Sequence, residues 1–234
     1  KLPQTFYVDD AGQGGFDGNG HAVTPVFYMQ SPNGIFRNAL QPNGLPDSRG
    51  ARVVTAVRAV GKALLAGGVD VMEITFRTAC AADAIRIGAE KFPEMHIGAG
   101  TVINGAQAEQ AIAAGATFIV SPGLSAEVAE VCKKADVPYF PGCATPTEIM
   151  QALSLGLTTL KFFPANVYGG LKALKALSAP FPQVRFLPTG GVTEQNLNEY
   201  LAFNKVIACG GSWMVPADAV ANKDWKKIED LTRS

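Results

Sequence analysis

The sequence is poor in the residues from which metal centres and disulfide frameworks are built. It has only two histidines and four cysteines in 234 residues. The cysteines form no C-x-x-C pair, and they stand at Cys80, Cys132, Cys143 and Cys209. A structural zinc site needs four closely spaced ligands, and a disulfide-stabilised domain is usually short and rich in cysteine. We therefore expect no metal, no other cofactor and a cytoplasmic protein with reduced thiols.

Charge of neither sign is in excess. Lys and Arg number 20, as do Asp and Glu, so the formal net charge is zero. Such a chain has no electrostatic attraction for nucleic acid or an anionic membrane surface. No apolar run reaches the roughly 20 residues that span a bilayer, and the start at Lys1 lacks a signal-peptide pattern. We expect a soluble, unsecreted protein whose partner is a small molecule or another protein.

From about residue 51 onward, short apolar runs alternate with longer Ala-rich stretches of helical period. This alternation is typical of βα units around a parallel sheet. Strands are predicted at residues 69–76, 95–99, 117–120, 137–140, 158–162, 184–187 and 206–209. The length suits one domain, so the predicted fold class is α/β, a single-domain (β/α)8 TIM barrel.

Several of the predicted helices have recognisable ends. Residues suited to an N-cap precede three of them, at Ser125, Thr145 and Thr193. Residues tolerant of positive φ close others, at Gly67-Gly68, Gly115 and Gly156.

A barrel needs an eighth strand, which must come from the first 50 residues. These are rich in Gly, Pro, Asn and Gln, which predict turns. Only residues 22–30 resemble a strand. We therefore predict an irregular segment at residues 1–21, the barrel at residues 22–234 and a long first βα loop at about residues 31–50.

Residues 51–66 allow two interpretations. Apolar residues follow a helical stripe at Val53, Val57, Val60 and Leu64, whereas the run VVTAV alone could form a strand. The helix is favoured because the stripe continues unbroken to the glycines at its end.

The strand at residues 69–76 carries two charged residues on one face. Side chains alternate along a strand, so Glu73 and Arg77 point opposite to the apolar Ile74. The apolar set must face the helices, which directs both charges into the barrel. A buried acid is expected to have a perturbed pKa. The alternative is a buried structural ion pair between the two residues.

A lysine interrupts the apolar strand TTLKFFPA. Lys161 lies near the C-terminal end of this strand, where barrel active sites are found. Desolvation favours a neutral amine, which attacks a carbonyl to form an imine, and the imine accepts electrons when a C–C bond breaks. The alternative is a lysine that extends out to solvent.

Three Gly-rich turns are predicted after the third, seventh and eighth strands. They are GAGT (residues 98–101), PTGG (residues 188–191) and GGS (residues 210–212). The last two adjoin each other in a barrel, where backbone N–H groups commonly bind a phosphate. Each glycine pair alone is more often just a tight turn, whereas the two together at adjoining loops favour a phosphate site.

Several long motifs together resemble one family. The segments GGVDVMEITFRT, GAGTV, IVSPGL, TLKFFPA, PFPQVRFLPTGG and GGSWMVP, in this order, are similar to those of the KDPG/KHG aldolases (2-keto-3-deoxy-6-phosphogluconate and 4-hydroxy-2-oxoglutarate aldolases). The resemblance covers about residues 56–232. Residues 1–50 depart from it, and the nearest candidates for the basic residue that many members carry in or after strand one, Arg37 and Arg49, lie in this unmatched part.

The resemblance implies a role for each matching residue. Lys161 would be the Schiff-base lysine and Glu73 the proton shuttle. Arg77 would bind the substrate carboxylate, with Thr101 nearby. The resemblance also implies that Pro122 and Phe163 line the keto-acid pocket, that the phosphate or distal end is bound by Thr189, Gly190, Gly191, Gly211 and Ser212, and that the protein is a metal-free homotrimer.

The function expected is therefore that of a class I aldolase acting on a small 2-keto acid. The substrate is 2-keto-3-deoxy-6-phosphogluconate, 4-hydroxy-2-oxoglutarate or both, since a Gly-rich pocket accepts phosphate or carboxylate. Two other interpretations remain: a phosphate-binding barrel isomerase or synthase, and an inactive barrel that serves as an interaction module.

Overall fold

A computed structural model describes residues 26–28 and 46–233 of the chain, in which strands and helices alternate. The strands are β1 (Val26–Tyr28), β2 (Val71–Thr75), β3 (His96–Gly100), β4 (Phe118–Val120), β5 (Tyr139–Phe140), β6 (Thr159–Phe162), β7 (Arg185–Pro188) and β8 (Cys209–Gly211). The helices are α2 (Pro46–Gly67), α3 (Ala81–Lys91), α4 (Gly105–Ala113), α5 (Ala126–Ala135), α6 (Pro146–Ser154), α7 (Gly170–Ser178), α8 (Glu194–Leu201), α9 (Ala217–Ala221) and α10 (Trp225–Arg233).

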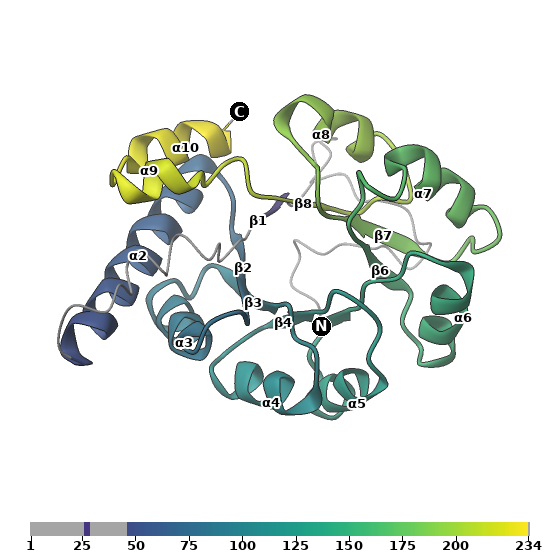
Figure 1. The fold of residues 1–234 in the computed structure, drawn as a ribbon, viewed down its shortest axis with the longest axis horizontal. Coiled ribbons are helices and arrows are strands. Elements are labelled where there is room, and N and C mark those ends of the chain that lie inside the picture. The colour runs from purple at the N-terminus through teal and green to yellow at the C-terminus, as the bar shows by residue number, and fades with distance from the viewer. Residues whose placement is uncertain (1–25, 29–45, 234) are drawn as a thin grey trace.

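The strands form a closed parallel barrel surrounded by the helices (Figure 1). Six strands pair in the order β5-β4-β3-β2-β1-β8, and β6 pairs with β7. Single parallel bridges join the two sheets, at Gly142–Lys161 on one side and at Phe186–Val206 and Thr189–Gly210 on the other. The predicted (β/α)8 barrel is confirmed, and strands β2 to β7 lie within two residues of their predicted bounds.

Strand β1 closes the barrel between β2 and β8. Tyr28 pairs with Met72 of β2, while Val26 pairs with Cys209 of β8. This strand falls inside the predicted residues 22–30, and the rest of that range lies outside the described residues. The predicted irregular segment at residues 1–21 also lies outside them, so this division of the chain stays a prediction.

Helix α2 settles the ambiguity of residues 51–66, which are helical, so the strand interpretation of VVTAV is wrong. The predicted end of the first loop, at about residue 50, is also wrong because α2 begins at Pro46. Proline suits the first helical turn, where its missing N–H leaves no hydrogen bond unmade. Residues 31–45 of the predicted loop lie outside the described residues.

Apolar side chains fill two layers. Alternate strand residues point inward and form a compact interior cluster of Val71, Phe118, Val120, Phe140, Leu187 and Ala208. Their sequence neighbours, such as Met72 and Ile119, point outward and pack against the helices. Burying both faces of strands β2 to β7 supplies the main stabilisation of the barrel and fixes the register of their side chains.

The predicted helix ends are largely observed. The Ser125 Oγ accepts a hydrogen bond from Val128 N–H at 3.3 Å. Thr145 and Glu148 form a reciprocal capping box at the start of α6. Gly68, Gly115 and Gly156 all have positive φ after a helix. These local signals end each helix so that the chain can enter the next strand.

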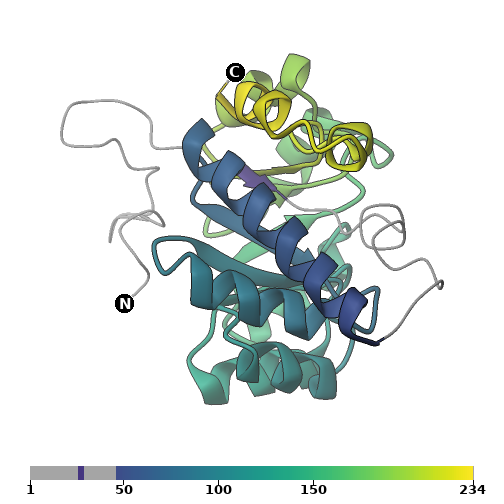
Figure 2. The same ribbon diagram turned by 90° about the vertical axis from the view of Figure 1, so that its left-hand side faces the viewer.

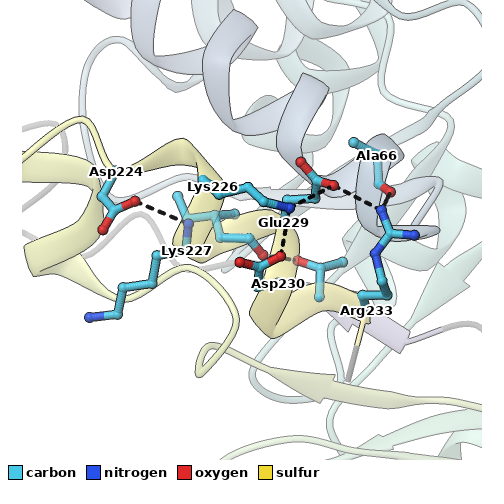
Figure 3. Close-up of polar contacts among 9 residues, drawn as sticks. Ala66, Asp224, Lys226, Lys227, Glu229, Asp230 and Arg233 are labelled. Carbon is cyan, nitrogen blue, oxygen red and sulfur yellow. Dashed lines mark hydrogen bonds and ion pairs between the residues drawn. The ribbon is translucent and has the colours of Figure 1, made fainter.

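Helix α10 packs along the C-terminal part of α2 (Figure 2). Arg233 Nη2 donates a hydrogen bond to the Ala66 carbonyl at 2.7 Å and also pairs with Glu229, as Figure 3 shows. Lys226 pairs with Glu229 and Asp230 in the same view. These exposed ion pairs contribute little stability each, so burial of Ile228 is the main anchor of α10. No helix in the described part of the chain is both long and apolar enough to cross a membrane.

Candidate active site

The predicted site residues meet at one end of the barrel. Glu73 lies on β2 and Lys161 on β6, and the others lie at or just after the C-terminal ends of β2, β3, β4, β6, β7 and β8. Because all strands are parallel, these ends surround a single mouth. A groove of about 530 Å³ between α2 and α10, lined by Arg58, Lys62 and Trp225 among others, lies on the outer layer and includes none of them.

Lys161 points into the barrel and is only 7% exposed. Its neighbours Leu160 and Phe162 are fully buried on the opposite face of β6. Two hydrogen bonds join the backbone of Lys161 to the segment after β5. The Lys161 N–H donates to the Pro141 carbonyl at 2.8 Å, and the Lys161 carbonyl accepts from the Cys143 N–H at 2.9 Å. This burial contradicts the interpretation in which Lys161 extends to solvent. The amine of Lys161 is therefore held inside the barrel, on a hydrogen-bonded strand, below the mouth.

Glu73 is buried on β2, four strands away from β6 around the barrel, with 8% exposure. Burial raises the pKa of this carboxyl above its usual value, although the positive charges of Lys161 and Arg77 oppose the rise. No described residue makes a hydrogen bond or ion pair with the carboxylate. A carboxyl in such surroundings is poised to exchange a proton rather than to remain permanently ionised.

Arg77 corrects one expectation. Its side chain is exposed, not inside the barrel, and it forms no ion pair with Glu73. The alternation of β2 ends at Thr75, and the Arg77 N–H donates to the Thr75 carbonyl in a tight turn at 2.9 Å. The structural ion pair considered from the sequence is therefore wrong. Arg77 Nε instead donates to Thr101 Oγ1 at 3.3 Å, which places both residues together at the rim.

The loop after β4 approaches the end of β5 closely. Pro122 is exposed, and a Cβ added to Gly142 would lie 2.5 Å from its carbonyl carbon. Ser121 Oγ donates to the Val102 carbonyl at 2.5 Å, which ties this loop to the one after β3. No sequence pattern singles out Gly142. Only the proximity of another backbone shows why a glycine is required there.

The loops after β6, β7 and β8 are linked to one another. The carbonyls of Thr189 and Gly190 accept hydrogen bonds from Ala165 and Asn166, at 2.8 and 2.9 Å. Gly190 and Gly191 have φ of 89° and 85°, a conformation that favours glycine. The Thr189–Gly210 bridge brings β8 beside them.

Two of the predicted glycine turns are wrong. Residues 98–100 belong to β3, and Gly210 and Gly211 belong to β8, which covers residues 209–211 rather than the predicted 206–209. These glycines are extended, and neighbouring side chains occupy the volume where a Cβ would stand: that of Glu73 at Gly100 and that of Trp213 at Gly211. A glycine required by a tertiary contact has the same sequence signature as a glycine required by a turn.

Phe163 and residues of the loops after β7 and β8 form the remaining part of the mouth. The Lys161 Nζ lies 5.0 Å from the centre of the half-buried Phe163 ring. The same ring lies 3.2 Å from the position of a Cβ added to Gly190. Phe163 therefore stands between the buried amine and the loop after β7, and Ser212 directly follows β8.

Comparison with known proteins agrees with this geometry. Residues 52–231 match the family profile described as KDPG and KHG aldolase. The KHG/KDPG aldolase of Escherichia coli K12 is 48% identical over 174 residues, covering 74% of this chain and 82% of that protein. The 2-dehydro-3-deoxy-phosphogluconate aldolase of Dickeya dadantii is 46% identical with the same coverage. A Legionella pneumophila KDPG aldolase, with pyruvate captured as a covalent carbinolamine, superposes with a TM-score of 0.76 at 37% identity, covering 90% of this chain and 91% of that one.

Proposed function

Because the chain belongs to the KDPG and KHG aldolase family, we propose that it is a class I aldolase whose Lys161 forms a Schiff base with a 2-keto-4-hydroxy acid. The reactions are cleavage of 2-keto-3-deoxy-6-phosphogluconate to pyruvate and glyceraldehyde 3-phosphate, and of 4-hydroxy-2-oxoglutarate to pyruvate and glyoxylate. The observation that carries the proposal is the burial of one amine and one carboxyl, Lys161 and Glu73, in the same barrel mouth.

The reaction begins when the neutral amine of Lys161 attacks the C2 carbonyl of the substrate. Loss of the carbonyl oxygen as water gives a protonated imine, which withdraws electrons from C3. A carboxylate at Glu73 then takes the proton of the C4 hydroxyl. The C3–C4 bond breaks, its electron pair forms an enamine on the lysine, and C4 leaves as an aldehyde.

The second half returns the enzyme to its starting state. Glu73 delivers the proton to C3 of the enamine, and water hydrolyses the resulting imine to pyruvate and free Lys161. The raised pKa of Glu73 supports this double use, because a group that both accepts and donates a proton works best near the operating pH.

Substrate binding is assigned to the rim. Arg77 binds the keto-acid carboxylate through charge-assisted hydrogen bonds, with Thr101 fixing the guanidinium. Pro122 and Phe163 line the keto-acid pocket. The distal phosphate or carboxylate is bound by residues of the linked β7 and β8 loops, namely Thr189, Gly190, Gly191, Gly211 and Ser212. Relative cleavage rates on the two substrates would establish which distal group this mouth prefers.

We also propose a cytoplasmic homotrimer. Large apolar side chains are exposed on α6 and in the loop after β6, including Met150 at 62%, Val167 at 77% and Tyr168 at 54%. Burial of such side chains between subunits is favourable. Sedimentation equilibrium would give the mass of the assembly directly.

The test of the reaction is covalent trapping. Incubation with pyruvate and borohydride should add one reduced pyruvyl group, located by peptide mapping on Lys161. The matched variants are Lys161→Met, which keeps the volume of the side chain without the amine, and Lys175→Met on the surface of α7. Lys161→Met should lose both adduct and turnover, and Lys175→Met neither. An adduct that survives in Lys161→Met would refute the assignment.

A further inference from the structure

We propose that Gly100 is a positioning residue for the carboxylate of Glu73, because its lack of a side chain leaves the volume that this carboxylate occupies. The inference rests on the proposed function, in which Glu73 transfers the proton. Gly100 itself touches neither the reacting atoms nor the imine.

The register of β2 and β3 shows how the two residues meet. Glu73 pairs with Gly98, and Thr75 pairs with Gly100. The Glu73 side chain does not stay beside its own partner but leans forward along the strand, toward the C-terminal mouth. A Cβ added to Gly100 would lie 2.5 Å from Glu73 Cδ, 2.8 Å from Cγ and closest of all to Oε1.

Packing determines where this carboxylate lies. Glu73 makes no hydrogen bond or ion pair with any residue of the described part of the chain, and the charges of Lys161 and Arg77 act on it without direct contact. Hydrogen bonds would hold the Glu73 side chain in place against an added Cβ at position 100. Without them, the side chain is expected to move when that Cβ occupies its volume. The absence of a side chain at Gly100 therefore determines where the carboxylate lies, and in the proposed reaction this sets its distance from the substrate.

Backbone conformation does not account for this glycine. Gly100 is an ordinary strand residue and is absent from the glycines of positive φ. Its carbonyl accepts a hydrogen bond from Phe76 N–H at 2.7 Å, which any residue can do. Alanine would fit the backbone, so its effect would come from the Cβ alone.

Gly98 provides a matched control on the same strand and face. A Cβ there would lie 2.5 Å from Phe118 Cδ2, and the ring packs in the interior cluster with Phe140. A packed ring cannot move aside as a flexible carboxylate can. Gly98→Ala should therefore lower stability, whereas Gly100→Ala should chiefly displace Glu73.

The expected effect is a selective loss of proton transfer. Gly100→Ala should lower kcat by about 30-fold or more, because a displacement of about 1 Å in a catalytic group has effects of this size. Borohydride trapping of pyruvate on Lys161 should continue, and KM should change little. Exchange of the pyruvate methyl protons with deuterium, which needs the imine and the base together, should fall in parallel with kcat.

A double-variant cycle identifies the carboxylate as the group affected. Glu73→Asp shortens the side chain by one methylene and withdraws it from Gly100. Adding Gly100→Ala to Glu73→Asp should then change kcat by less than about 3-fold. If Gly100→Ala alone folds poorly, the double variant should recover its melting temperature, because the shorter acid vacates the space.

The outcomes separate the two hypotheses. Near-normal turnover of Gly100→Ala, an equal loss in both backgrounds, or a loss of trapping that matches the loss of turnover would each overturn the positioning role. Failure of the wild-type protein to be trapped would overturn the Schiff-base reaction itself, and with it the role of Gly100.

Discussion

The Nζ atom of Lys161 lies 5.0 Å from the centre of the Phe163 ring, two residues further along the same segment. An aromatic face at this distance attracts a positive nitrogen. The amine becomes positive when it is protonated and again when it forms the protonated imine. In the proposed reaction, Phe163 is therefore placed to stabilise the charged intermediate.

Phe163→Leu should weaken formation of the imine. Loss of a contact of about 0.5 to 2 kcal/mol corresponds to a roughly 2- to 30-fold higher pyruvate concentration for half-maximal trapping. Phe203→Leu is the matched control, because its ring lies 5.8 Å from the exposed Lys175 and outside the mouth. Equal trapping by the two variants would show that the ring does not stabilise the imine.

Glu73→Gln should separate proton transfer from imine formation. The amide keeps the shape of the side chain but cannot shuttle a proton, so kcat should fall by about 100-fold or more while trapping continues. In the wild type, kcat should fall at acidic pH, with a midpoint above that of an ordinary glutamate because burial raises the pKa. An unchanged kcat in Glu73→Gln would leave this residue without a catalytic role.

The same substitution should alter stability in a pH-dependent way. Burial raises the pKa of Glu73 in the folded state, so the folded protein binds more protons than the unfolded chain. This contribution to stability is fully present below the unfolded pKa and is lost as pH rises through the folded pKa. Glu73→Gln should therefore gain melting temperature relative to the wild type at neutral pH, and this gain should vanish at acidic pH. A gain that is the same at every pH would contradict the buried, proton-binding carboxyl.

Arg77→Gln should chiefly affect substrate binding. Removing a charge-assisted contact to the carboxylate should raise KM about 10-fold or more. Arg86→Gln on α3 is the matched control, because it breaks only an exposed pair with Asp83 and should leave KM unchanged. A large drop in kcat at unchanged KM would place Arg77 in the chemical step instead.

Removal of Val26–Tyr28 should abolish folding. This strand pairs with both β2 and β8. Its loss would therefore open the barrel and leave the backbone groups along one edge of each of these two strands unpaired. Soluble yield and thermal unfolding would measure the effect. Deletion of three residues from the range 1–21 is the control and should leave both unchanged. A soluble, active protein without β1 would mean that the barrel closes in another register.

The sequence predicted the alternation of elements because that signal is local. Strands β2 to β7 and the cap at Thr145 depend on neighbours within a few residues. The inward direction of Glu73 also followed from the strand period of two, since its apolar neighbours must face the helices. Similarity to a known family added roles to these residues, which periodicity alone does not supply.

Other features depended on contacts between distant segments. Arg77 was assigned to the interior because alternation was extended past Thr75, where β2 ends. Gly210 was assigned to a turn, although Thr189 Oγ1 stands 2.6 Å from where its Cβ would be. No local pattern distinguishes these cases.

The amino-acid sequence by itself determined the fold class, the strand that carries Lys161 and the face on which Glu73 lies, because hydrophobic periodicity is written residue by residue along the chain. Only the tertiary structure decided that β1 closes the barrel between β2 and β8, that Arg77 lies at the rim beside Thr101, and that Gly100 accommodates the carboxylate of Glu73. These relationships arise where residues far apart in sequence compete for the same space or hydrogen-bonding groups, and that competition exists only once the chain has folded.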